Sequence, residues 1–141
     1  MSLALLGACS DPESPEAHLR ATLAEAEEAA EQRDLGFFRA LIAEDYSDRR
    51  GRSRSEIIQR AWIYFNQNQS IHVLSSIESI EFPIPELARV ELVAGLAGRD
   101  KQASSVWDLQ ADVYRFELEM RLDDAGDWKL IRAGWHRGVH K

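Results

Sequence analysis

Apolar and charged side chains alternate along the chain from residue 112 to residue 122. One parity carries the apolar set Tyr114, Phe116, Leu118, Met120 and Leu122, and the other carries the charged set Arg115, Glu117, Glu119 and Arg121. A period of two predicts a strand with one buried face and one solvated face. Turn residues at 123–127 separate this run from a second one at 128–135, so the two runs predict an antiparallel hairpin.

The first half of the chain shows helical spacing instead. Ser14 and Pro15 suit an N-cap and a first helical position. The apolar stripe that follows them consists of Leu19, Leu23, Ala26 and Ala30. This pattern predicts an amphipathic helix that ends near Arg33. Asp34 is expected to cap a second, shorter helix that stops before Asp45.

A third helix is indicated by a capping box, because Ser53 and Glu56 stand three residues apart ahead of an apolar run. Its stripe consists of Ile57, Ile58, Ala61, Trp62 and Phe65. We expect Trp62 to lie in the core and the polar residues 66–69 to end the helix. The arginine-rich segment 49–54 that precedes it is predicted to be a loop.

Strand-like runs follow at residues 71–82, 87–96, 106–122 and 128–136. Helices first and strands afterwards predict an α+β fold. Because the apolar face of the four-stranded antiparallel sheet needs a cover, the three helices should pack on it. A long twisted sheet that curls around helices makes a cone. In that arrangement Phe116, Leu118 and Ile131 should be mostly buried.

The length and the net charge of the chain limit the number of domains and the classes of protein to which it can belong. The chain has 141 residues and a net charge of -7. This length suits one domain with a core of its own, which we expect to span residues 15–141 after a tether of residues 1–14. An acidic chain lacks the basic footprint of nucleic-acid-binding proteins. No apolar run approaches the roughly 20 residues of a membrane-spanning helix.

The N-terminal segment resembles a bacterial lipobox, since residues 6–9 read Leu-Gly-Ala-Cys and a polar linker follows. The resemblance implies lipidation at Cys9, a place on the periplasmic side of the cell envelope, and membrane contact through that anchor alone. Otherwise a cytoplasmic location is expected. Only eight residues precede Cys9, fewer than a complete signal peptide needs, so residues 1–3 are interpreted as a cloning remnant in place of the true start.

The order of elements resembles the NTF2-like superfamily, also called SnoaL-like. The matching pieces are residues 33–35, 41–46, 55–58 and 128–131. The resemblance implies a cone-shaped α+β fold with three N-terminal helices on a curved four-stranded antiparallel sheet. It also implies a pocket between helices and sheet, and a homodimer formed through the sheet. The superfamily includes isomerases, dehydratases and ligand-binding modules, so function must be argued from the site.

Asp112 and Tyr114 are the candidate catalytic pair. An isomerase on this scaffold needs a carboxylate base in an apolar pocket and a hydrogen-bond donor that faces the developing oxyanion. Asp112 shares its parity with Tyr114, so both side chains can point into the cone. The alternative is that Asp112 is solvated near the start of its strand.

Ligand-binding candidates are Tyr46, Arg49, Arg52, Tyr64 and Tyr114. The tyrosines can line a pocket with their hydroxyls as polar anchors, or they can pack in the core. Residues 49–60 hold five arginines against one glutamate, which indicates either an anion site or a solvated loop. The histidines are scattered without metal-ligand spacing. We therefore expect no metal and no cofactor.

Three functions stay open. The first is a non-catalytic, envelope-associated domain that binds a small ligand or a protein partner. The second is a small lyase or isomerase with Asp112 as base and Tyr114 as donor. The third is a structural dimerisation module that uses the exposed face of the sheet.

Overall fold

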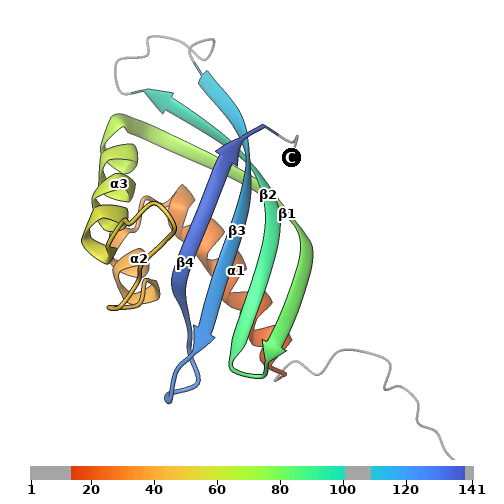
Figure 1. Ribbon diagram of the computed structural model, residues 1–141. Helices are drawn as coiled ribbons and strands as arrows, with labels where there is room; N and C mark the ends of the chain where they lie inside the picture. The colour runs from red at the N-terminus through yellow and green to blue at the C-terminus, as the bar shows by residue number, and fades with distance from the viewer. Residues whose placement is uncertain (1–13, 101–108, 139–141) are drawn as a thin grey trace, which may run out of the picture.

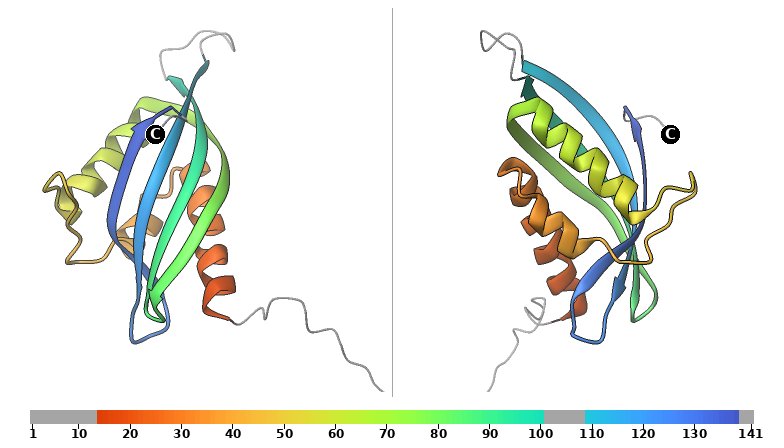
Figure 2. Two further views of the ribbon diagram at one scale, coloured as in Figure 1. Left: turned by 45° about the vertical axis from the view of Figure 1, so that its right-hand side comes forward. Right: turned by 90° about the vertical axis from the view of Figure 1, so that its left-hand side faces the viewer.

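Three helices and then four strands make up the part of the chain that the computed structural model describes, residues 14–100 and 109–138. The elements are α1 (Pro15–Glu31), α2 (Leu35–Leu41), α3 (Arg54–Gln67), β1 (Asn68–Ile84), β2 (Leu87–Asp100), β3 (Leu109–Leu122) and β4 (Trp128–Arg137). The strands form one antiparallel sheet in the order β1-β2-β3-β4 (Figure 1). All three helices lie on the same face of that curved sheet (Figure 2). The predicted α+β cone is thus confirmed.

Side-chain caps begin each helix. The Ser14 hydroxyl accepts a hydrogen bond from the Ala17 amide at 3.1 Å, and the Asp34 carboxylate accepts one from the Phe37 amide at 3.2 Å. At α3 both halves of the predicted capping box are present around Ser53. These contacts satisfy amides that have no partner inside their helices. The helix starts that the sequence predicted are confirmed.

Arg33 joins the end of α1 to the end of α3. Its backbone has a φ of 55°, in the left-handed region that commonly terminates helices. Its guanidinium donates to the carbonyl oxygen of Asn68 at 3.0 Å and to that of Phe65 at 3.4 Å. The left-handed turn therefore directs a cation at carbonyls that end α3.

Irregular pairing curls the sheet. The β1–β2 register shifts three times, and the β3–β4 register shifts once, between Glu119 and Met120. Bulges of this kind bend a strand and increase its twist. After α2 the chain runs along the free edge of β4, where the Ala43 amide donates to the Leu130 carbonyl at 2.9 Å. This pairing satisfies a carbonyl oxygen that the edge of β4 would otherwise leave unpaired.

One end of the cone is packed solid. We call it the packed end, and it is defined by the side chains that are fully buried there, Leu19, Val90, Met120 and Trp128. They come from α1, β2, β3 and β4. The Trp128 indole also donates to the Pro15 carbonyl at 3.2 Å, which fixes the start of α1 on the sheet.

One expectation about burial needs correction. Trp62 is 52% exposed rather than part of the core, because the face of α3 that meets the sheet centres on Ile57, Ala61 and Phe65. Phe116, Leu118 and Ile131 are mostly buried, as predicted, although none of them is fully buried. For Phe116 and Leu118 the reason is that they line a cavity.

The strand limits also differ. β1 starts at Asn68, directly after α3, so residues 66–69 do not form a separate connection. β2 runs to Asp100 instead of stopping at Leu96. The longer β2 places Gly98 inside the sheet, which matters for the site below.

Candidate functional site

A cavity of about 670 Å³ occupies the cone between α1, α3 and the concave face of the sheet. Its walls are mostly aliphatic and aromatic, with Phe38, Phe65, Leu92, Phe116 and Trp135 among them. Met120 lies where the cavity meets the packed end and also lines it. We call it the cone cavity. Ring contacts join its aromatic wall, since the Tyr114 and Phe116 centroids lie 6.1 Å apart and those of Phe116 and Trp135 lie 6.4 Å apart.

The mouth of the cone cavity lies between α1 and α3. Its lining includes three exposed residues, Arg20 and Ala24 on α1 and Arg60 on α3, which mark where it meets solvent. Arg20 pairs with Glu16 at 3.1 Å. Glu27 also lines the cavity and accepts a hydrogen bond from the Ser75 hydroxyl at 2.8 Å. The mouth therefore carries the charged groups, and the interior is apolar.

A smaller pocket of about 120 Å³ adjoins the cone cavity. We call it the polar pocket, and its lining consists of Tyr64, Gln67, Asn68, Leu96, Gly98, Asp112 and Tyr114. Tyr64, Leu96 and Tyr114 belong to both linings. The structure thus brings three of the predicted site residues together, namely Asp112, Tyr114 and Tyr64, from the start of β3 and the end of α3.

Arg137 forms an ion pair with Asp112. Its Nε lies 3.5 Å from the Asp112 carboxylate, whose side chain is 39% exposed. Its guanidinium also lies 5.9 Å from the centre of the Tyr114 ring, because Arg137 and Tyr114 are cross-strand partners. The candidate base therefore sits in an ion pair near solvent, not in an apolar enclosure.

The surroundings of Tyr64 raise the pKa of its hydroxyl group. Burial raises the pKa of its phenol, and the nearby Tyr114 and Asp112 raise it further. A raised pKa keeps the hydroxyl protonated at neutral pH, so Tyr64 can act as a hydrogen-bond donor. Together with Tyr114 it places two phenols where the apolar cavity meets the polar pocket.

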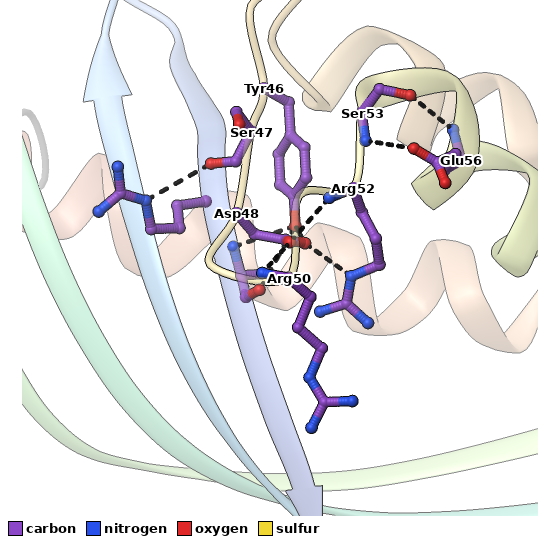
Figure 3. Close-up of polar contacts among 9 residues, drawn as sticks. Tyr46, Ser47, Asp48, Arg50, Arg52, Ser53 and Glu56 are labelled. Carbon is purple, nitrogen blue, oxygen red and sulfur yellow. Dashed lines mark hydrogen bonds and ion pairs between the residues drawn. The ribbon is translucent and has the colours of Figure 1, made fainter.

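The predicted ligand residues Tyr46 and Arg52 lie elsewhere, in a buried network around Asp48 (Figure 3). The Tyr46 hydroxyl donates to the Asp48 carboxylate at 2.7 Å, and the Arg52 Nε donates to the same oxygen at 2.8 Å. The amides of Arg50 and Arg52 bind the other carboxylate oxygen. All three residues of the network are less than 10% exposed.

This network has clear electrostatic consequences. Burial alone would raise the pKa of Asp48, but the hydrogen bonds from Tyr46, from Arg52 and from the amides outweigh it and lower that pKa to about 2. Burial and the Asp48 carboxylate both raise the pKa of Tyr46. The Arg52 guanidinium also stacks on Trp135 at 4.1 Å from the ring centre. Tyr46 and Arg52 thus fix the loop on β4.

Arg49 is exposed and lies on the outer side of the sheet. There it lines a groove of about 670 Å³ with Arg50 and Arg52, opposite Glu91 and Glu117 on the outward faces of β2 and β3. The groove and the cone cavity share Leu118, Ala133 and Trp135 in their linings. Anion binding by Arg49 and Arg52 stays a prediction.

The predictions about lipidation, membrane-spanning helices and metal binding concern other parts of the chain. Cys9 lies outside the described residues, so its lipidation stays a prediction. No helix within residues 14–100 and 109–138 is long and apolar enough to cross a membrane. In the same ranges no three His, Cys, Asp or Glu side chains gather as potential metal ligands.

Sequence reasoning missed Gly98 and Arg137. Gly98 lies beyond residue 96, where the strand was predicted to end, although it continues the inward parity of Leu92, Ala94 and Leu96 along β2. Extending that period of two by one step would have placed it in the pocket wall. The position of Arg137 opposite Tyr114 depends on the β3–β4 register. A hairpin turn fixes that register only approximately when a bulge follows.

No protein-family model and no curated protein sequence matches this chain. Solved structures do share its fold. A proposed scytalone dehydratase from Novosphingobium aromaticivorans superposes with a TM-score of 0.76 at 15% identity, over 88% of this chain and 84% of the other. An NTF2-like superfamily protein from Salmonella enterica serovar Typhimurium gives 0.70 at 9% identity, over 89% and 92%.

An enzyme is also among these structures. The LinA-type3 hexachlorocyclohexane dehydrochlorinase of Novosphingobium barchaimii superposes with a TM-score of 0.70 at 10% identity, over 88% of this chain and 86% of the other. At such low identities the likeness shows the fold alone. The chain therefore has the NTF2-like fold, and its function must be argued from its own side chains.

Proposed function

We propose that this chain is a binding domain that holds a small, largely apolar molecule in the cone cavity. The observation that carries the proposal is the cavity itself, about 670 Å³ with apolar and aromatic walls and a mouth between α1 and α3. Small-molecule sites commonly have volumes of roughly 300–1,000 Å³ and such walls. The half-exposed, ion-paired setting of Asp112 supports binding more than proton abstraction.

Binding of the apolar fluorophore N-phenyl-1-naphthylamine tests this function. We expect its fluorescence to rise on addition of the protein and to saturate with one site per chain. Ala61→Trp should abolish the rise, because residue 61 lines the cavity. Ala40→Trp is the matched control, because residue 40 is exposed on α2 and lines none of the cavities described above. Equal binding by both variants, or no saturable binding by the wild type, would refute the proposal.

The lyase or isomerase is the second candidate, because Asp112, Tyr114 and Tyr64 gather beside the cavity and because fold neighbours include a dehydrochlorinase. Its first step would be removal of a proton from carbon by Asp112. Incubating 2-tetralone with the protein in D2O and following loss of the α-proton signals by NMR distinguishes the two. Exchange that disappears in Asp112→Asn would establish the enzyme. The binding function predicts the same slow exchange for both proteins.

The envelope location through Cys9 and the homodimer are also proposed here. For the dimer, the outward faces of β1 and β3 expose Leu74 (80%) and Val113 (41%), and exposed apolar side chains on a sheet favour association. Leu74→Asp should then convert a dimer to a monomer in light scattering. A wild-type monomer would exclude both the dimer and the dimerisation module.

A further inference from the structure

The polar pocket opens onto the cone cavity through shared walls. Tyr64 and Tyr114 contribute to both linings, one from α3 and the other from β3. A ligand whose body fills the apolar cavity can therefore extend one end between these phenols. The chemistry of the pocket then decides what that end must be.

Two polar atoms beside Gly98 are unused. The Tyr64 hydroxyl forms no hydrogen bond with any residue that the structure describes. The Asn68 side chain uses its amide nitrogen, which donates to the Tyr64 carbonyl at 2.9 Å. Within the described ranges no donor reaches its amide oxygen. Beside Gly98 the pocket thus offers a free donor and a free acceptor, and the side chains of Gln67 and Tyr114 bring further polar groups to its lining.

The charges of the pocket favour a neutral group. Asp112 is its charged lining residue, and it repels an anion. A cationic group would meet Arg137, which already pairs with Asp112. A hydroxyl can accept a hydrogen bond from Tyr64 and donate one to Asn68, so it satisfies both free atoms without charge.

Gly98 keeps this space open. A Cβ at residue 98 would stand 2.5 Å from the Asn68 amide oxygen and 3.1 Å from the Tyr64 hydroxyl. Any larger side chain would thus displace the two atoms that are free to bind a ligand. Since the contact with Asn68 is at the end of a side chain, a methyl group should close the pocket without unfolding the sheet.

We propose that the polar pocket is a subsite for the hydroxyl group of an otherwise apolar ligand, a neutral alcohol or phenol whose body fills the cone cavity. Tyr64 donates to the hydroxyl oxygen, and the hydroxyl donates to Asn68. The inference rests on the proposed binding function and specifies its ligand class. An anionic ligand would point the other way, toward Arg20 and Arg60 at the mouth.

The test uses three compounds with one body: biphenyl, its para-hydroxy derivative and its para-carboxylate. Their affinities are measured by displacement of N-phenyl-1-naphthylamine. We expect the hydroxy compound to bind about tenfold more tightly than biphenyl, as one or two hydrogen bonds allow. The carboxylate should bind more weakly than the hydroxy compound.

The hydroxyl advantage is the ratio of the affinities for the hydroxy compound and for biphenyl in the same protein. Gly98→Ala and Tyr64→Phe should each reduce this ratio to about twofold or less. Gly134→Ala is the control, because a Cβ there meets nothing within 4 Å. It should keep the full advantage.

Each other outcome overturns the inference. Equal affinity for biphenyl and its hydroxy derivative removes the subsite and leaves the binding function intact, as does a hydroxyl advantage that survives both variants. A carboxylate that binds best, and loses that preference in Arg60→Gln, places the polar end at the mouth. Failure of all three compounds to bind removes the binding function and the subsite together.

Discussion

Helices α1 and α3 cover the same face of the sheet, yet they bury their apolar stripes to different extents. α1 buries Leu19 completely and Ala29 almost completely, whereas α3 has no buried residue. α1 packs mainly along β1. Its Leu19 closes the packed end, and residues farther along the helix line the cone cavity. α3 instead roofs the cone cavity, so Ile57 and Phe65 face a space and stay half-buried. An amphipathic stripe therefore predicts which face points inward but not whether the interior is filled.

Truncating one apolar residue in each helix should give the largest difference in the free energy of unfolding. Leu19→Ala should lower the free energy of unfolding by about 3 kcal/mol, because it leaves a void in a filled core. Ile57→Ala should lower it by about 1 kcal/mol, because that side chain buries only part of its surface. Urea unfolding followed by circular dichroism measures both. Equal losses would mean that α3 packs as tightly as α1.

The Asp48 network should give the next largest effect. It lies between the two regions, since it fixes the loop after α2 on β4 and holds Arg52 against the cavity residue Trp135. Asp48→Asn should cost about 2 kcal/mol at neutral pH, because Arg52 loses its buried partner. Asp124→Asn, in an exposed turn, is the control and should cost almost nothing.

The pH dependence of this effect has a definite sign. The folded pKa of Asp48 is about 2, below an unfolded value of about 3.9. The stabilisation is therefore complete above about pH 4 and is lost as pH falls toward pH 2. The difference between wild type and Asp48→Asn in urea midpoint should shrink over that range. A difference that is constant from neutral pH to about pH 2 would show that the charge is not what stabilises the loop.

Much of the fold was predictable because its signals are local. Ser14, Asp34 and Ser53 cap helices through contacts within a few residues, and the alternation in β3 fixes which side chains point inward. The same parity placed Asp112 and Tyr114 correctly beside the cavity. Caps and strand alternation involve residues that are close in sequence, so they form in the same way whatever the tertiary packing is.

The rest depends on contacts between distant residues. Arg52 looked like part of a solvated or anion-binding cluster, but Asp48 and Tyr46 hold it in a buried network. Asp48 and Arg52 stand four residues apart, but their burial comes from the packing of the loop on β4. The polar pocket needs the end of α3 next to Gly98, which no local pattern encodes. Whether the cone is hollow depends on how the helices sit on the sheet.

Enlarging an alanine in each region should give the smallest effects, with opposite signs. Ala88 is 1% exposed on the inner face of β2 at the packed end, so Ala88→Leu should destabilise the protein by about 1 kcal/mol or more through overpacking. Ala61 lines the cone cavity from α3, so Ala61→Leu can fill empty space and should stabilise the protein by about 0.5 kcal/mol. Thermal melts of both variants measure whether each change raises or lowers the stability. Because both variants replace alanine by leucine, each serves as the control for the other. The Ala61→Leu protein should also bind N-phenyl-1-naphthylamine more weakly, since the side chain takes up volume that the dye needs. If leucine at residue 61 destabilises as much as leucine at residue 88, α3 closes on the sheet in solution and the contrast between the two helices disappears.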